Sequence, residues 1–306
     1  MPTKLARIRE PVIYIGSHFT AKGLTVWPVP YDSPMDRYES PHPNIHVDRD
    51  GYLVTVTIDN PDAKNACTGD MWVSLGAIFG RLAYSEARAI ILTGANGEFC
   101  SGADLSASKS AGGPPPADEA RRHSLVDGMR VLAESVVAIH DCPVPVVAKV
   151  DGLCVGAGLG LALAADVTWC SDRARFSAIF AKRGLSLDFG TSWLLRQRIG
   201  VHRAKEMALT AKMVPAAEAL QLGLVNAVVP AADLDSAARE IADVIAAGPP
   251  IALSNTKRQL NYAATASLAQ ALEAETLAQA VNANTEDMRE ALMAFIERRP
   301  AVFKGR

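Results

Sequence analysis

Two glycine-rich segments could place free backbone N–H groups around one reacting oxygen. The first, Gly97–Leu105, follows an apolar run that ends at Leu92-Thr93, and the second, Val150–Asp166, follows the apolar run Val146–Val150. Small residues let the backbone turn sharply, and Gly156-Ala157-Gly158 should open a helix running to Ala165. The start of a helix offers unpaired N–H donors and a partial positive charge. Such donors stabilise an oxygen that gains negative charge in a transition state, so the pattern indicates an oxyanion hole.

Four segments, in matching order and spacing, resemble the crotonase superfamily, the enoyl-CoA hydratase/isomerase family. Phe99–Leu105 resembles its F-x-x-G-A-D-[LI] motif, and Val150–Gly158 resembles its second glycine-rich turn. Ile58–Ala66 and Ala294–Lys304 complete the set, so that the likeness covers roughly residues 45–306. The resemblance implies an α/β fold, the crotonase-type β-β-α superhelix, with a C-terminal α-helical region.

The resemblance also implies a substrate, an acyl-CoA thioester, and roles for particular residues. The oxyanion donors would be the N–H groups of Ala103 and Ala157, where crotonases more often have Gly at the second position. Lys64, and Lys304 of a neighbouring subunit, would contact CoA, unless they are ordinary solvated surface charges. No metal or redox cofactor is expected, because the oxyanion hole would itself polarise the thioester, and CoA enters as part of the substrate. Further residues expected to line the substrate site are Ala66, Gly102, Asp104, Leu105, Gly156, Phe180 and Trp193. For Phe180 and Trp193, ordinary core packing is the alternative, and Asp104 and Asp166 are expected to brace the backbone.

The sequence departs from the hydratase pattern at two decisive positions. Hydratases of this family use two glutamates to activate water, and the corresponding positions here are Gly160 and Phe180. Neither residue can transfer a proton, and losing both should cost orders of magnitude in hydration rate.

Asp188 is the carboxylate that remains in a suitable place. It occupies a position where several relatives, including ring-modifying isomerases and a dehalogenase, keep a functional Asp. It could act as a base at the α- or γ-carbon of the thioester, or as a nucleophile on an acyl ring. The alternative is that Asp188 only caps a helix that starts near Thr191.

The favoured function is therefore double-bond isomerisation or related enolate chemistry. A hydratase with a substituted base and a non-catalytic acyl-CoA-binding protein stay open as alternatives. A dinucleotide-binding turn is disfavoured because Leu161 stands where its third glycine should be. The sequence contains no G-x-S-x-G elbow and no P-loop.

An α/β arrangement must position these residues. Asp50-Gly51 predicts a hairpin within residues 45–58, where apolar and polar residues alternate. A helix should begin near Thr68, with Met71, Leu75, Ile78 and Leu82 on its buried face. Buried strands are predicted at 89–93, 144–150, 167–170 and near 176, with a helix over about 119–140. After about residue 200 the strand signals fade, and helical patterns appear around 232–246 and 267–297.

This pattern divides the chain into three parts. We expect residues 1–43 to form an extended N-terminal arm, residues 44–200 to form a crotonase core with the CoA thioester site, and residues 201–306 to form a helical oligomerisation region. The breaker-rich loop 105–118 and the helix over 119–140 should shape the acyl site. The resemblance implies a homotrimer or a dimer of trimers, with the helical tail packing on neighbours.

Bulk composition narrows the function classes. Of the 306 residues 49% are apolar, which is enough for a large core, and the formal net charge is −2. No stripe of Lys or Arg is present, so neither nucleic acid nor a membrane is an expected partner. The five cysteines are scattered without a C-x-x-C pair, which indicates neither a zinc site nor a disulfide framework. The lack of a signal peptide or an apolar span predicts a cytoplasmic protein.

Overall fold

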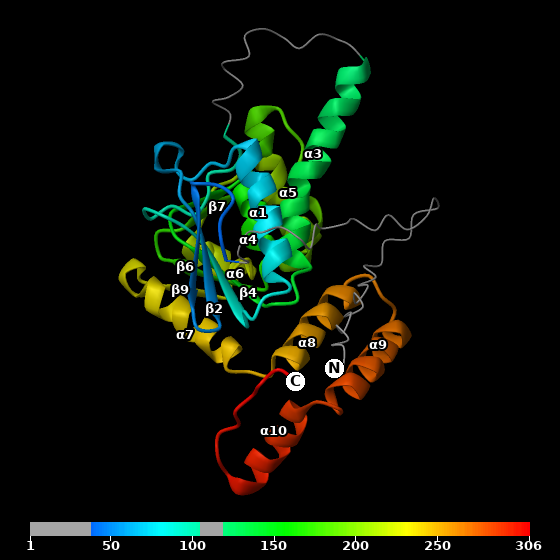
Figure 1. Cartoon of the computed structure of the whole chain (residues 1–306). Helices are drawn as coiled ribbons and strands as arrows, with labels where there is room; N and C mark the ends of the chain where they lie inside the picture. Colours follow the sequence, from blue (N-terminus) through cyan, green and yellow to red (C-terminus); the bar gives the residue numbers. More distant parts are fainter. Residues whose placement is uncertain (1–37, 105–118) are drawn as a thin grey trace, which may run out of the picture. The chain divides into compact units, whose positions relative to one another are not determined.

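The described strands form two separate sheets, and the chain crosses from the larger sheet to the smaller one after β4 and again after β6. Figure 1 shows the course of the chain. A computed structural model describes residues 38–104 and 119–306, with the side chains of 119–124 left out. The larger sheet has the strand order β1-β2-β3-β4-β6-β9, and the smaller one has the order β5-β7-β8. The β1–β2 and β7–β8 pairs are antiparallel, and all other pairs are parallel. The strands are β1 (Ile45–Asp50), β2 (Leu53–Ile58), β3 (Ala89–Gly94), β4 (Val146–Val150), β5 (Leu153–Val155), β6 (Val167–Ser171), β7 (Arg175–Ser177), β8 (Val214–Pro215) and β9 (Ala227–Val229).

Two consecutive units each contain a strand of the larger sheet, a strand of the smaller sheet and then a helix. This is the repeat of the predicted β-β-α superhelix. β4 leads to β5 and then to α4 (Ala157–Ala164). β6 leads to β7 and then, through the 3-10 helix η2 (Ile179–Arg183), to α5 (Thr191–Thr210). The predicted fold class is confirmed. The remaining helices are α1 (Gly69–Leu82), α3 (Glu119–His140), α6 (Ala216–Leu222), α7 (Leu234–Ala246), α8 (Pro250–Ala263), α9 (Leu268–Asn282) and α10 (Glu286–Glu297), and the other 3-10 helices are η1 (Pro61–Ala63) and η3 (Ala231–Asp233).

The N-terminal elements form where the local signals place them. Asp50 pairs with Leu53 across the predicted hairpin, and Gly51 takes the left-handed conformation with φ of +60°. The Thr68 hydroxyl accepts the Met71 N–H at 3.3 Å and caps α1. The four apolar residues predicted for the inner face of α1 are all buried.

Strands continue past residue 200, where none was expected. β9 pairs in parallel with β6 and completes the larger sheet, and β8 pairs with β7. β9 has three residues and β8 has two, so neither is long enough to show an alternating pattern. None of the helices described is long and apolar enough to cross a membrane.

The larger sheet packs against helices on both faces. Val54, Val56 and Leu92 belong to the main core together with residues of α1, α3 and α4. Their neighbours along the strands, Leu53 and Ile91, face the other way and pack with residues of α7. All eight residues of α4 are buried, so this helix has no solvent-exposed face.

Asp166 joins the helical tail to the core. Its carboxylate accepts the Val146 N–H at 2.7 Å and binds the buried Lys257 ammonium of α8 at 2.8 Å. The predicted bracing role of Asp166 is therefore confirmed. By contrast, α9 buries none of its residues within the chain. Its exposed apolar side chains are Leu268, Leu272, Leu277 and Val281.

Candidate active site

The two glycine-rich turns lie side by side, just beyond the carboxyl ends of β3 and β4. Cys100 N–H donates to the Leu153 carbonyl at 2.9 Å, and Val155 N–H donates to the Cys100 carbonyl at 3.1 Å. Together these bonds make a parallel bridge between Cys100 and Cys154. The fold thus brings together two segments that lie about fifty residues apart in the sequence. This is required if both turns are to contribute to one oxyanion hole.

A second bridge orients the first turn. Cys67 N–H donates to the Gly102 carbonyl and Asp104 N–H donates to the Cys67 carbonyl, both at 2.9 Å. Because these groups flank Ala103 and face Cys67, the N–H of Ala103 points away from Cys67. The backbone N–H of Asp104 is thus part of this bridge.

Ala103 and Ala157 both present backbone N–H groups with no hydrogen-bond acceptor in the part of the chain that the structure describes. Ala157 is the first residue of α4 and has no intrahelical acceptor. The Ala157 nitrogen lies close to the first turn, since a Cβ on Gly102 would lie 3.6 Å from it. The arrangement could stabilise negative charge on one oxygen placed between the turns.

Glycine is required at the joint between the turns. Gly102 and Gly156 have φ of +103° and +58°, a region that other residues rarely adopt. A Cβ on Gly158 would lie 2.3 Å from the Cys100 carbonyl oxygen, so only glycine allows this approach. These residues fix the positions of the two N–H groups.

Protein atoms surround the two positions at which the resemblance would place glutamates. A Cβ on Gly160 would lie 2.5 Å from the main-chain oxygen of Phe189. Phe180 is buried in the core. Gly160 lies one turn along α4 from Ala157, so Phe189 approaches the same face of this helix as the candidate donor.

Asp188 directly precedes Phe189 in the sequence, and its carboxylate does not cap α5. The N-cap residue of α5 is Gly190, and no side chain caps the helix. The Asp188 main chain, rather than its carboxylate, accepts the Thr191 N–H at 3.0 Å. Among the described residues, no group donates a hydrogen bond to the buried Oδ1 atom of Asp188. Burial raises the pKa of this carboxyl group to about 6. The alternative of a side-chain helix cap is therefore wrong.

Lys64 and Ala66 flank the buried residue Asn65. The Lys64 side chain is 60% exposed, with its Nζ atom 3.6 Å from Oε1 of Glu98, while Ala66 is buried. Trp193 is partly buried, and its ring meets that of His140 edge-on with 5.7 Å between centroids. Leu105 and the loop 105–118 lie outside the described residues, as do residues 1–37 of the predicted arm.

Lys304 does not approach the candidate donors of its own chain. It is exposed, and the preceding carbonyl of Phe303 accepts a hydrogen bond from Arg88 at 2.9 Å. Arg88 immediately precedes β3, whereas both candidate donors follow the carboxyl ends of the strands. A groove of about 680 Å³ lies at this amino end of the strands, away from the two turns. Its lining includes Tyr52, Arg88, Asp243, Phe303, Lys304 and Arg306.

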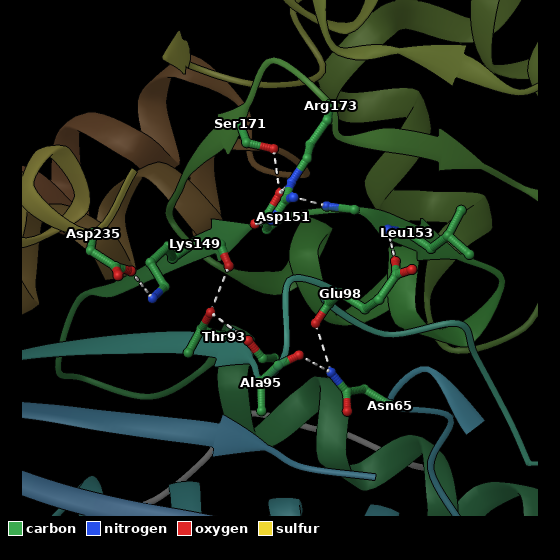
Figure 2. Close-up of polar contacts among 12 residues, drawn as sticks. Asn65, Thr93, Ala95, Glu98, Lys149, Asp151, Leu153, Ser171, Arg173 and Asp235 are labelled. Atoms are coloured by element: carbon green, nitrogen blue, oxygen red, sulfur yellow. Dashed lines mark hydrogen bonds and ion pairs between the residues drawn. The ribbon is translucent and has the colours of Figure 1, made fainter. Parts of the chain in front are cut away.

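Polar residues that the sequence analysis did not single out hold the turns in place (Figure 2). The Asn65 amide donates to the carbonyls of Ala95 and Glu98 at 2.8 and 2.7 Å. The Asp151 carboxylate accepts hydrogen bonds from Ser171 at 2.6 Å and from Arg173 at 2.7 Å. An acidic residue directly after a strand was the available signal for Asp151. Asn65 gave no such signal, because its partners are main-chain atoms about thirty residues away.

The cysteines near the turns are core residues. Cys67, Cys100 and Cys154 are buried, and burial raises the pKa of the Cys154 thiol well above its usual value. They are free thiols. Within the described residues, no group of three or more His, Cys, Asp or Glu side chains could hold a metal ion.

Comparison with known proteins identifies relatives along most of the chain. The family model described as Enoyl-CoA hydratase/isomerase matches residues 48–306. A Rhodobacter capsulatus protein named "Probable enoyl-CoA hydratase" is 37% identical over 255 residues, which are 83% of this chain and 95% of that protein. The short-chain-enoyl-CoA hydratase of Clostridium acetobutylicum is 33% identical, over 84% of this chain and 95% of that protein. The crystal structure of an enoyl-CoA hydratase from Bacillus anthracis is similar with a TM-score of 0.79 and 30% identity, covering 86% of this chain and 100% of that one.

Proposed function

The chain belongs to the enoyl-CoA hydratase/isomerase family, and from this premise we propose that it shifts a double bond in an acyl-CoA thioester, with Asp188 as the base. The thioester carbonyl oxygen lies between the N–H groups of Ala103 and Ala157. CoA enters only as part of the substrate, and the two N–H groups polarise the carbonyl.

One carboxylate is enough for this reaction. The Asp188 carboxylate removes a proton from the α-carbon of a 3-enoyl thioester, and the electron pair moves onto the carbonyl oxygen to form a dienolate. The protonated Asp188 then returns the proton to the γ-carbon, which gives the 2-enoyl thioester and restores the carboxylate. No atom is gained or lost, and the negative charge rests on the oxygen that the two donors face.

The proposal rests on one observation, the burial of the Asp188 carboxylate without a hydrogen-bond donor among the described residues. Its Oδ1 atom is buried without a partner among the described residues, and its pKa of about 6 suits a base that works near neutral pH. A carboxylate used only for structure would be expected to accept a hydrogen bond. The lack of a carboxylate at Gly160 and Phe180 favours proton transfer within the substrate over the activation of water.

The CoA part and the assembly complete the proposal. Lys64 contacts the CoA moiety from the same chain and Lys304 from a neighbouring subunit, which is supported by the exposure of both side chains. Ala66, Gly102, Asp104, Leu105, Gly156, Phe180 and Trp193 surround the thioester and its acyl group. Homotrimers, or dimers of trimers, would cover the apolar residues that α9 leaves exposed.

The test compares wild-type protein with Asp188→Asn on a panel of 2-enoyl-CoA and 3-enoyl-CoA thioesters. We expect wild type to isomerise a 3-enoyl substrate, and the variant to be slower by about a hundredfold or more. Hydration of 2-enoyl-CoA at equal rates by both proteins would instead indicate a hydratase with a substituted base. Binding of the thioesters by both proteins without turnover would indicate an acyl-CoA-binding protein.

A further inference from the structure

Glu98 connects the two candidate donor turns through its side chain. It lies in the segment that leads to Ala103, and its Oε2 atom accepts the Leu153 N–H at 2.6 Å (Figure 2). Leu153 opens β5, which ends two residues before Ala157. The hydrogen bond is short and charge-assisted, which places it among the stronger types. One carboxylate thus joins the segment of the first donor to the strand that carries the second.

The backbone around Glu98 is built for this contact. Its carbonyl accepts the Asn65 amide at 2.7 Å, and Asn65 is buried. On the other side, a Cβ on Gly152 would lie 2.3 Å from Oε2 of Glu98. Gly152 has φ of +56°, so its position is suited to glycine for both reasons. The carboxylate can reach the Leu153 N–H because residue 152 has no side chain.

The charge of Glu98 matters less than its oxygen. The Lys64 ammonium lies 3.6 Å from Oε1, but the Lys64 side chain is 60% exposed. An ion pair with this exposure contributes little to stability, because solvent screens it. The contact to Leu153 is closer and partly buried. Loss of the acceptor should therefore matter more than loss of the negative charge.

We propose that Glu98 is a positioning residue that aligns the Ala157 N–H with the thioester oxygen by holding Leu153. This inference rests on the proposed function, because it assumes that Ala157 is an oxyanion donor. Glu98 itself does not touch the substrate. Removal of its acceptor oxygen leaves β5 paired with Cys100 and with β7, but deprives the Leu153 N–H of its side-chain acceptor.

The variants separate this role from a general loss of stability. Glu98→Leu keeps the approximate size but removes the acceptor, whereas Glu98→Gln keeps an oxygen that can accept the Leu153 N–H. The matched control is Lys149→Met, which removes the ion pair between Lys149 of β4 and Asp235 (Figure 2) and touches neither turn. Thermal unfolding of each variant establishes that it is folded.

The main measurement is the absorbance of a bound 2,4-dienoyl-CoA, in Asp188→Asn protein so that the ligand is not turned over. A conjugated thioester absorbs at longer wavelength when its carbonyl is polarised. We expect Glu98→Leu to lose most of the red shift while its affinity for free CoA stays within about twofold. Glu98→Gln and Lys149→Met should keep the shift. In the Asp188-intact protein, Glu98→Leu should lower kcat by about ten- to a hundredfold, with KM changed little.

Two results would overturn the role of Glu98: a full red shift in Glu98→Leu, or an equal loss in Lys149→Met. A third result has a different meaning. If the protein with Glu98 intact binds the dienoyl thioester without any red shift, the proposed oxyanion hole fails, and the positioning role fails with it. The defect is then present before Glu98 is changed, so the two failures are distinguishable.

Discussion

The main-chain oxygen of Phe189 occupies the space that a side chain on Gly160 would need. A Cβ at position 160 would lie 2.5 Å from that oxygen and 3.0 Å from the Phe189 Cβ. Phe189 is itself fixed, with a left-handed backbone (φ of +46°) and its ring centroid 4.5 Å from that of Trp72. The segment that directly follows Asp188 therefore leaves no room for a side chain at position 160.

This contact predicts a cost for any side chain at position 160. Gly160→Ala should lower the free energy of unfolding by about 1–3 kcal/mol, because the new Cβ meets a main-chain atom that cannot swing away. Gly80→Ala in α1 is the matched control, since nothing lies within 4 Å of its Cβ. The control should gain about 0.5–1 kcal/mol from the better helix propensity of alanine. Urea unfolding of both variants measures the difference, and a Gly160→Ala protein as stable as wild type would contradict the contact.

Asp188 should reduce stability at neutral pH. Its pKa lies at about 6 in the folded protein against an ordinary value of 3.8, because burial disfavours the charged form. The native state then binds more protons than the unfolded state between these values, so stability falls as pH rises from about 4 to about 6. The carboxyl group is only partly buried, so solvent screening leaves an effect of about 1 kcal/mol.

The measurement is the unfolding free energy of wild type and Asp188→Asn as a function of pH. The Asn variant should be more stable by about 1 kcal/mol at pH near 7.5 and equal to wild type at pH near 4. A variant that is less stable at neutral pH would mean that the carboxylate is held by favourable contacts.

The same group should set the acid limb of the rate profile. If Asp188 is the base, kcat/KM for 3-enoyl-CoA isomerisation should rise with pH through about 6 and level off above it, because only the carboxylate accepts a proton. Residual activity of Asp188→Asn should lack this limb. A limb that persists unchanged in the Asn variant would assign the titration to another group.

The second donor can be removed with a substitution that suits its position. Proline is favoured at the first residue of a helix and has no N–H, so Ala157→Pro deletes the proposed donor with little change to α4. We expect kcat to fall by about a hundred- to a thousandfold, with circular dichroism unchanged. Folded protein with wild-type turnover would exclude Ala157 from the oxyanion hole.

The sequence was informative wherever local signals specify structure. The hairpin at Asp50-Gly51, the helix start near Thr68 and the helix start at Ala157 each depend on a few neighbouring residues, and the structure confirms them. The strands β8 and β9 were missed because two or three residues carry no periodicity, and β9 forms only by pairing with β6 across the fold. The helix α8 was not predicted either.

The two glycine-rich motifs of the candidate site could be predicted from the sequence. The residues that hold these motifs in place, and the hydrogen-bonding state of Asp188, could not. Whether Asp188 is a cap or a free carboxylate depended on one detail, the left-handed N-cap Gly190, which a single sequence does not reveal. Glu98 and Asn65 act on main-chain atoms of distant segments, so no spacing in the sequence marks them. The roles of Lys64, Lys304 and Leu105 stay predictions.

The complete burial of α4 has a consequence for exchange of amide protons with deuterated water. A helix without a solvent face cannot open alone, since its neighbours on every side would have to move with it. Its hydrogen-bonded amides should therefore exchange only when the whole domain unfolds. The amide of Ala157 lies at the first residue of the same helix without an intrahelical acceptor, so it should exchange first and become protected when a thioester is bound. A single deuterium-labelling experiment would then report both the rigidity of the scaffold and the occupancy of its site.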